Sequence, residues 1–307
     1  MTTTPTRPVL VGVDGLPGSS GAVRYAVVEA RRRQAPLQLV HVIPDFLSPG
    51  PPVPLPDLDR IGVDILEREA RSVRQMARDL TVTTALVHGE RSTGLVRAAE
   101  PAQLLVIGRE TRHGVERFYT GTVTASVAAH APCDVVVVPS FWVDDHPHRT
   151  VVVGLKNGRH CTELLSQAFS EAAERDARLV VVTAWEVADP YSDRIELRTH
   201  ADEWEAYGRR LVDEVVADWR TAFPEVVVES RVVHGPAAKV LLQATDESDL
   251  LVVSRRRLAL PPYGYLGGVV HSLLRLSDVP VHVVPYMADP PAPDEDLVLE
   301  AAGAPVK

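Results

Sequence analysis

Val9-Leu-Val-Gly-Val-Asp14 recurs as Val151-Val-Val-Gly-Leu-Lys156, at an offset of 142 residues. Leu37-Gln-Leu-Val-His-Val42 recurs at the same offset as Leu179-Val-Val-Val-Thr-Ala184. Each stretch is a short apolar run, which is typical of a strand covered on both faces in a parallel sheet. The chain therefore repeats two of its strands in the same order.

The repeat continues after one small insertion. Val87-His-Gly89 recurs as Val233-His-Gly235, and Leu104-Leu-Val-Ile-Gly-Arg109 recurs as Leu250-Leu-Val-Val-Ser-Arg255, both at an offset of 146 residues. Matched blocks in one order indicate two tandem domains of one fold.

The length of 307 residues suits two ordinary domains, each large enough to bury its own core. We expect the first domain over residues 1–142 and the second over residues 149–286, with a linker over residues 140–149. The Pro-rich and acidic composition of residues 287–307 predicts a disordered tail.

Helical patterns separate the apolar runs. One helix is predicted to begin at Ser19 or Ser20 and to end near Gln34. A second is predicted over residues 57–79, with an apolar stripe formed by Ile61, Ile65, Val73 and Met76. Alternating strands and helices predict an α/β, Rossmann-like fold, in which each domain has a five-stranded, mostly parallel sheet with helices on both faces. The predicted strands are Val9–Val13, Leu37–Ile43, Ala85–Val87, Leu104–Ile107 and Val135–Val138, then Val151–Val153, Leu179–Thr183, Val226–Val228, Leu250–Val253 and Val281–Val284.

Charge and hydropathy restrict the partners and the location. The net charge of −9 supplies no general attraction for nucleic acid or for an anionic membrane surface. The N-terminus lacks the apolar run of a signal peptide, and no segment has the apolar length of a membrane span. We therefore expect a cytoplasmic protein in which Cys133 and Cys161 stay reduced and have packing roles.

Ligands of open parallel sheets bind beyond the carboxyl ends of the strands. A carboxylate there can accept hydrogen bonds from ribose hydroxyls, and a strand-end backbone can pair with the edge of adenine. The amides of a glycine loop and a helix N-terminus can hold phosphates. The strand ends of the first repeat predict a nucleotide pocket of this kind. A loop that begins at Gly108 is closed by Gly121-Thr122, which are expected at the start of a helix. The candidate residues of the pocket are Asp14, Val42, Gly89, Gly108, Gly121, Thr122 and Thr124.

Gly108-Arg-Glu-Thr111, nine further residues and Gly121-Thr122 resemble the motif Gly-x2-Gly-x9-Gly-[Ser/Thr] of ATP-binding universal stress proteins. Three of the four motif positions match, because Thr111 stands at the second glycine. The end of the repeat, from Val127 to Pro139, is similar to the same family. With the repeat, the resemblance covers nearly all of residues 9–286 and points to tandem two-domain members.

The resemblance implies an adenine nucleotide alpha hydrolase-like fold and an adenine nucleotide, ATP with or without Mg²⁺, as ligand. Asp14 would meet the ribose, Val42 the adenine through its backbone, and Gly108, Gly121 and Thr122 the triphosphate. A left-handed backbone would strain Thr111, and Gly114 could supply the flexibility instead. The resemblance also implies pairing of the last strand of each repeat, and leaves a homodimer open.

The second repeat lacks this chemistry at the aligned positions, which hold Lys156, Ser254, Arg257 and Gly267-Gly268. Lys156 cannot accept hydrogen bonds from ribose hydroxyls. The second site is therefore predicted to be degenerate, with a different anion bound by Lys156 and its neighbouring arginines as the alternative.

We expect an ATP-binding stress-response sensor or regulator that acts through an unidentified protein partner. One alternative is a slow ATPase or nucleotidyl-transfer enzyme that uses His113 and Glu116, and another is a nucleotide-free scaffold. Taken singly, strand-end glycines can make tight turns and Asp14 can cap a helix. His41 and His130 are expected to form hydrogen bonds at element ends, and no metal-ligand spacing is recognisable.

Overall fold

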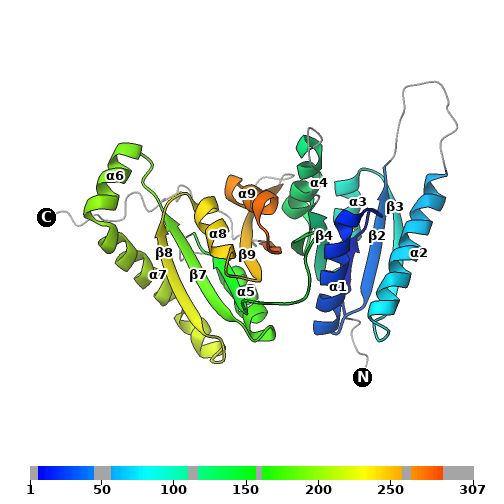
Figure 1. Cartoon of the computed structure of the whole chain (residues 1–307), viewed down its shortest axis with the longest axis horizontal. Coiled ribbons are helices and arrows are strands. Elements are labelled where there is room, and N and C mark those ends of the chain that lie inside the picture. Colours follow the sequence, from blue (N-terminus) through cyan, green and yellow to red (C-terminus); the bar gives the residue numbers. More distant parts are fainter. Residues whose placement is uncertain (1–5, 45–56, 110–116, 157–160, 258–263, 286–307) are drawn as a thin grey trace. The chain divides into compact units, whose positions relative to one another are not determined.

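The computed structural model describes residues 6–44, 57–109, 117–156, 161–257 and 264–285. The chain divides into two compact units. Within the described residues, unit 1 runs to His146 and also includes Ser277–Pro285, whereas unit 2 covers Pro147–Leu276. Each unit is an α/β sheet with helices packed on it, as predicted (Figure 1).

Unit 1 has its strands in the order β3-β2-β1-β4-β5-β11. The first five are parallel, and β11 is antiparallel to β5. In chain order the elements are β1 (Val9–Gly12), the 3-10 turn η1 (Pro17–Ser19), α1 (Ser20–Arg32), β2 (Leu37–Ile43), α2 (Leu58–Met76), β3 (Val82–His88), α3 (Arg91–Ala98), β4 (Leu104–Arg109), α4 (Arg117–His130), β5 (Asp134–Pro139) and β11 (Val281–Pro285).

The central strands of unit 1 are apolar because helices cover both faces of the sheet. α1 and α2 pack on one face, and α3 and α4 on the other. Val9 and Val11 of β1, with Leu37 and Leu39 of β2, belong to the core under α1 and α2, and all four are fully buried. This explains the continuous apolar runs of the sequence.

The buried stripe of α2 differs from the predicted one. Ile61 and Met76 are exposed, and the buried residues are Gly62, Leu66, Ala70 and Val73. Small residues bring the helix close to the sheet, since a Cβ atom on Gly62 would lie 2.6 Å from Leu86 Cδ1. Asp57 caps the helix by accepting a hydrogen bond from the Arg60 amide at 3.1 Å.

The first part of the predicted linker packs on α1. Arg24 donates hydrogen bonds to the carbonyl oxygens of Ser140 and Trp142, at 3.1 Å and 2.7 Å. The Trp142 ring packs edge-on against Tyr25, with 5.0 Å between ring centroids. These contacts hold the chain that leaves β5.

Unit 2 has its strands in the order β9-β6-β7-β8, all parallel, with β10 antiparallel to β9. Its α5 and α7 pack on strands of the sheet, as do α8 and α9. In chain order the elements are β6 (Thr150–Gly154), α5 (Thr162–Glu174), β7 (Arg178–Trp185), α6 (Pro190–Thr199), α7 (Ala201–Ala222), β8 (Val228–His234), α8 (Ala237–Thr245), β9 (Leu250–Arg257), β10 (Gly264–Tyr265) and α9 (Gly268–Leu276). The prediction of a strand over Val226–Val228 is wrong, because β8 begins where that run ends.

The last strands of the two repeats pair, as the resemblance implied. Within unit 1, β11 lies antiparallel to β5, with Val281 opposite Val137 and Val283 opposite Val135. The fully buried His282 lies 2.9 Å from Asp134 through its Nε2 atom. The final strand of the second repeat thus completes the sheet of unit 1.

Candidate functional site

The carboxyl ends of β1, β2 and β3 lie at one edge of the sheet of unit 1. Parallel register places Gly12 opposite Val40, and Val42 opposite Val87. The residues that follow these strands are therefore neighbours, which is the arrangement that open α/β sheets use for ligands.

Asp14 follows β1 and is exposed to solvent. Its Oδ1 atom accepts a hydrogen bond from the Leu16 amide at 2.9 Å. His41 Nδ1 donates to the carbonyl oxygen of Val13 at 2.7 Å, which joins the ends of β2 and β1 next to Asp14. The turn fixes one carboxylate oxygen of this exposed side chain, and a carboxylate has further acceptor capacity, so Asp14 can accept hydrogen bonds from a sugar hydroxyl.

Val42 and Gly89 form the neighbouring strand ends. The Val42 side chain is 7% exposed, and a Cβ atom on Gly94 would lie 2.9 Å from its Cγ1 atom. Gly89 has φ of +128°, and its amide donates to the Ile43 carbonyl at 3.0 Å. That backbone conformation favours glycine, so Gly89 is required by the turn from β3 to α3.

Glu90 already occupies the N-terminus of α3. Its carboxylate accepts hydrogen bonds from the amides of Ser92 and Thr93, at 3.0 Å and 2.7 Å, and from both hydroxyls. Burial acts to raise the pKa of Glu90, but the hydrogen bonds from Ser92 and Thr93 outweigh it and lower the pKa from 4.5 to about 2. An anionic ligand would meet this negative charge at the N-terminus of α3.

Gly108 lies within β4, opposite Val138, rather than at the start of a loop. A Cβ atom on Gly108 would lie 2.8 Å from the carbonyl oxygen of Gly18 and 3.3 Å from the Cα atom of Ser19. Glycine at this position therefore lets the turn η1, which follows Asp14, pack against the end of β4. The prediction that the loop begins at Gly108 is wrong, because β4 continues to Arg109.

The placement of Gly121 and Thr122 at a helix start is also wrong. α4 begins at Arg117, so both residues, and the half-buried Thr124, lie inside the helix. Nothing between Arg117 and Thr120 stops a helix, since this stretch has no proline or glycine. The predicted loop residues Thr111, His113, Gly114 and Glu116 lie outside the described residues.

Unit 2 differs at the same positions. Lys156 follows β6 and is exposed. β9 runs through Ser254 to Arg257 and pairs there with β10, whose Gly264 lies opposite Arg257. The chain thus forms a hairpin at the position where the motif of repeat one has Thr111.

Aromatic rings fill the carboxyl end of β7 in unit 2, which sequence reasoning missed. Trp185 ends this strand and is 3% exposed; its ring stacks on Trp204 at 5.6 Å and meets His234 at 4.5 Å between centroids. His234 Nε2 lies 2.8 Å from Asp193 Oδ1. Packed rings therefore occupy this strand end in unit 2.

A matching pair in unit 1 was also missed. His88 ends β3, and its Nε2 atom lies 2.8 Å from Asp59 Oδ1 of α2. The signal was present in the sequence, because His88 and His234 occupy the same place in the repeated Val-His-Gly block. His41 and His130 behave as predicted, and His130 Nδ1 bonds to the Ser126 carbonyl at 2.8 Å.

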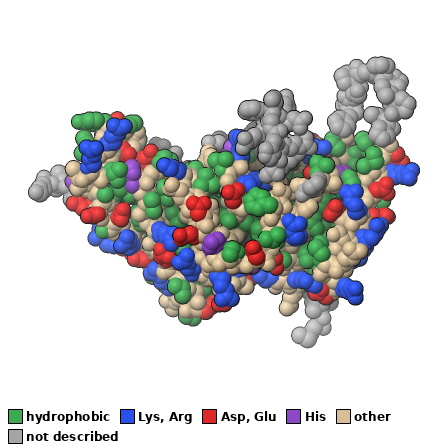
Figure 2. Space-filling view, viewed as in Figure 1, with side chains coloured by type: hydrophobic (Ala, Val, Ile, Leu, Met, Phe, Trp, Pro, Cys, Tyr) green, Lys and Arg blue, Asp and Glu red, His purple; other side chains and the backbone are tan. Residues whose placement is uncertain are grey.

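Other ligand classes receive little support from the described residues. Arg side chains are interspersed with Asp and Glu over the drawn face of unit 1 (Figure 2). No three or more His, Cys, Asp and Glu residues of the described ranges gather as metal ligands. In those ranges, every helix is too short or too polar to cross a membrane.

The chain is similar to known proteins both in sequence and in fold. A model of the universal stress protein family matches residues 5–139 and 147–285. A universal stress protein of Mycobacterium tuberculosis strain H37Rv is 29% identical over 290 residues, covering 90% of this chain and 96% of the relative. A universal stress protein of Mycolicibacterium smegmatis is 29% identical over 288 residues, with coverage of 90% and 96%.

One solved structure matches the fold along most of the chain. The crystal structure of a universal stress protein from Archaeoglobus fulgidus has a TM-score of 0.70 at 16% identity. The match covers 92% of this chain and 97% of that chain. At this level of identity, the likeness shows the tandem α/β fold alone.

Proposed function

Because the chain belongs to the universal stress protein family, we propose that it is a stress-response regulator that binds one ATP molecule in unit 1. The observation that carries this proposal is the unequal pair Asp14 and Lys156. Both residues follow the first strand of their repeat and are exposed. Only the carboxylate can accept hydrogen bonds from ribose hydroxyls.

Each candidate residue has a defined role in the proposal. Asp14 accepts from the ribose, and the backbone at Val42 pairs with the adenine edge. Gly108, through its close approach to Gly18, holds the turn that follows Asp14 against the end of β4, beside the proposed phosphate position. Amides of the first turn of α4, which precede Gly121, hold the phosphate chain together with the hydroxyls of Thr122 and Thr124, and Mg²⁺ accompanies the ATP.

The second repeat supports a count of one site. Lys156 stands in place of the carboxylate, and Arg257, which aligns with Thr111, lies in β9 where that strand pairs with β10. The packed rings of Trp185 and Trp204 take the strand end where a base would lie. Unit 2 therefore has a structural role, and the regulatory state of the protein depends on whether unit 1 holds a nucleotide.

Ligand-induced stabilisation tests the proposal. ATP at about a hundred times its dissociation constant should raise the free energy of unfolding by about 2.7 kcal/mol. The measurement is the melting temperature with and without ATP and Mg²⁺. A melting temperature that does not change at millimolar ATP would support the nucleotide-free scaffold instead.

A charge placed in the phosphate position sharpens this test. Gly121→Glu should abolish the ATP-dependent rise in melting temperature, because its carboxylate repels the phosphates. The control is Gly268→Glu, which adds the same charge at the first residue of α9 in unit 2. Loss of the effect in both variants would contradict a site confined to unit 1.

A further inference from the structure

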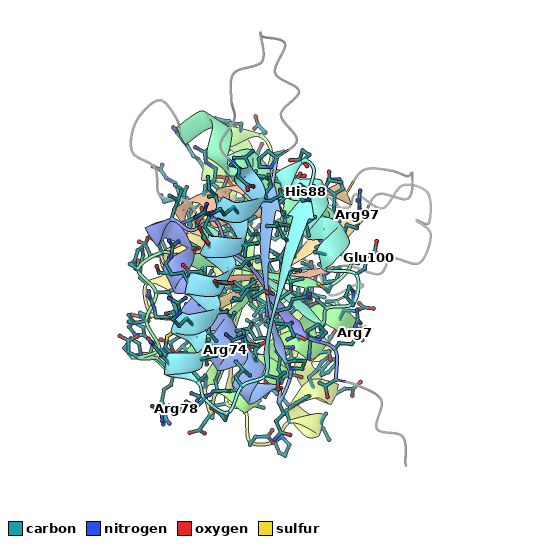
Figure 3. The ribbon with its side chains drawn as sticks, turned by 90° about the vertical axis from the view of Figure 1, so that its right-hand side faces the viewer. Arg7, Arg74, Arg78, His88, Arg97 and Glu100 are labelled. Atoms are coloured by element: carbon teal, nitrogen blue, oxygen red, sulfur yellow. The ribbon has the colours of Figure 1, made fainter. Side chains whose placement is uncertain are left out.

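The outer edge of unit 1 carries a groove that the nucleotide site does not use. It has a volume of about 580 Å³ and lies between α2 and β3. We call it the arginine groove, and its lining residues are Glu67, Ala70, Arg71, Arg74, Gln75, Arg78 and Thr84. Figure 3 looks onto this edge, with Arg74 and Arg78 towards the lower end of α2 and His88 at the upper end of β3.

Among the described residues, β3 is an edge strand that pairs on one side alone. It comes last in the strand order, and its ladder within the described ranges is the one with β2. Its outer backbone N–H and C=O groups can therefore pair with another extended chain. Thr83 and Thr84 are exposed and uncharged, so no charged side chain guards this part of the strand.

The equivalent edge of unit 2 is guarded. β8 occupies the place of β3, and Glu229 and Arg231 stand where β3 has Thr83 and Ala85. Arg231 Nε donates to Glu229 Oε1 at 2.6 Å. Charged side chains of this kind protect edge strands from pairing with other chains. The edge strand therefore carries charged side chains in the second repeat and uncharged ones at the matching positions of the first.

The groove itself also differs between the repeats. In unit 2, Asp213 accepts hydrogen bonds from Arg220 and Ser230, both at 3.1 Å. The equivalent residues in unit 1, Glu67, Arg74 and Thr84, line an open groove instead.

Two further arginines are specific to repeat one. The positions of Arg71 and Arg78 hold Ala217 and Pro224 in the second repeat. Because the same helix and strand form there without these arginines, the fold does not require them.

We propose that the arginine groove binds an acidic peptide, which pairs in extended form with the free edge of β3. The three arginines outnumber the one carboxylate of the groove, so the lining favours an anion. Arg71 and Arg74 lie three residues apart on α2, a rise of about 4.5 Å, and Arg78 follows shortly after the helix ends at Met76. Alternate side chains of an extended peptide are about 6.6 Å apart, so acidic residues at every second position come within reach of these long side chains.

The free strand edge favours a peptide over nucleic acid, because a sugar-phosphate backbone cannot continue a β-ladder. A second copy of the chain fits less well. Antiparallel pairing of two β3 strands would bring Arg71, Arg74 and Arg78 of both copies to the same joint edge, where like charges repel.

The test uses the full-length protein and a fluorescently labelled peptide of alternating Glu and Val, about eight residues long. Fluorescence anisotropy should show saturable binding that weakens as salt is added. Replacing all three arginines, as Arg71→Ser, Arg74→Ser and Arg78→Ser together, should weaken binding about tenfold. The matched control is Arg220→Ser in unit 2, which should leave peptide binding unchanged.

Backbone pairing has its own control. The same peptide with N-methyl groups on alternate amides keeps every charge but cannot complete a ladder, and it should bind about tenfold more weakly. Equal binding of the two peptides, or of the triple variant and the parent protein, would overturn the proposal. So would preferential binding of a single-stranded oligonucleotide, or self-association that the triple variant abolishes.

The experiments can contradict peptide binding in the arginine groove without contradicting ATP binding in unit 1. The triple variant should keep its melting temperature without ligand and should keep its stabilisation by ATP, because no groove residue lies among the proposed nucleotide contacts. The same melting curves show whether the triple variant is folded. If it is not, Arg74→Ser alone is the milder variant for the binding assay.

Discussion

Gly108 and Gly18 lie so close that a Cβ atom on Gly108 would come within 2.8 Å of the Gly18 carbonyl oxygen. Gly18 belongs to the turn η1, which begins three residues after Asp14. The second repeat has Ser254 at the place of Gly108. A glycine at the end of β4 is therefore part of what keeps Asp14 and the strand ends in position.

Gly108→Ser copies the second repeat into the first. The added side chain must displace the backbone of η1, which should cost about 1 kcal/mol of stability. We expect ATP affinity to fall about tenfold, equivalent to 1.4 kcal/mol, because the turn that carries Asp14 moves. Calorimetric titration measures the affinity. Ser254→Gly is the control, and an effect as large from this variant would contradict the assignment of the site to unit 1.

Asp14→Ala and Lys156→Ala compare the two strand ends directly. Loss of the Asp14 carboxylate removes hydrogen bonds to the ribose, each worth about 1.5 kcal/mol when one partner is charged. ATP affinity should therefore fall about tenfold in Asp14→Ala and remain unchanged in Lys156→Ala. Equal losses in the two variants would mean that unit 2 also binds nucleotide.

Glu90 makes stability depend on pH in a defined window. Its folded-state pKa is lowered from 4.5 to about 2, so its contribution is complete above pH 4.5 and is lost as the pH falls towards 2. Glu90→Gln should lower the free energy of unfolding by about 1 kcal/mol above pH 4.5, the usual value of a helix cap. Urea unfolding across this range should show the difference shrinking as acid is added; a difference that grows would contradict the capping role.

Glu171 tests the buried charges that the repeats share. It is 1% exposed on α5, and its carboxylate bonds with Arg175 and, at 2.9 Å, with Gln167. Glu29 holds the same place on α1, where it pairs with Arg32 and Arg33. Replacing Glu171 removes the buried carboxylate that bonds with Arg175 and Gln167, so Glu171→Ala should cost about 3 kcal/mol in urea unfolding.

The exposed Glu163 in the first turn of the same helix is the control for Glu171. Its replacement by Ala should change the free energy of unfolding by less than about 0.5 kcal/mol. A similarly small cost for Glu171→Ala would show that the buried pair contributes no net stability.

Much of the fold could be predicted because its strands are buried on both faces. The continuous apolar runs at Val9 and Leu104 can only be satisfied under two helical layers, and the internal repeat fixes their order. Side-chain size limited the prediction for α2. Large apolar residues at helical spacing predicted that Ile61 faces the sheet, whereas the small residues Gly62 and Ala70 are the ones that pack closely on it.

The same reasoning failed at edge strands and loop ends. Val226 is 7% exposed, but it packs in the turn after α7, and the strand that follows contains Glu229 and Arg231. An edge strand is partly exposed and needs no continuous apolar run, so the hydrophobic pattern did not mark β8 as a strand. The predicted positions of Gly108 and Gly121 came from motif spacing, which does not say where β4 ends or where α4 begins.

The most direct test of the central claim is the stoichiometry of ATP binding. Calorimetric titration of the nucleotide-free, full-length protein with ATP and Mg²⁺ should give a single ATP for each chain, and Asp14→Ala should remove that binding in the same concentration range. Two equivalents per chain, or one equivalent that persists in Asp14→Ala and disappears in Lys156→Ala, would contradict it.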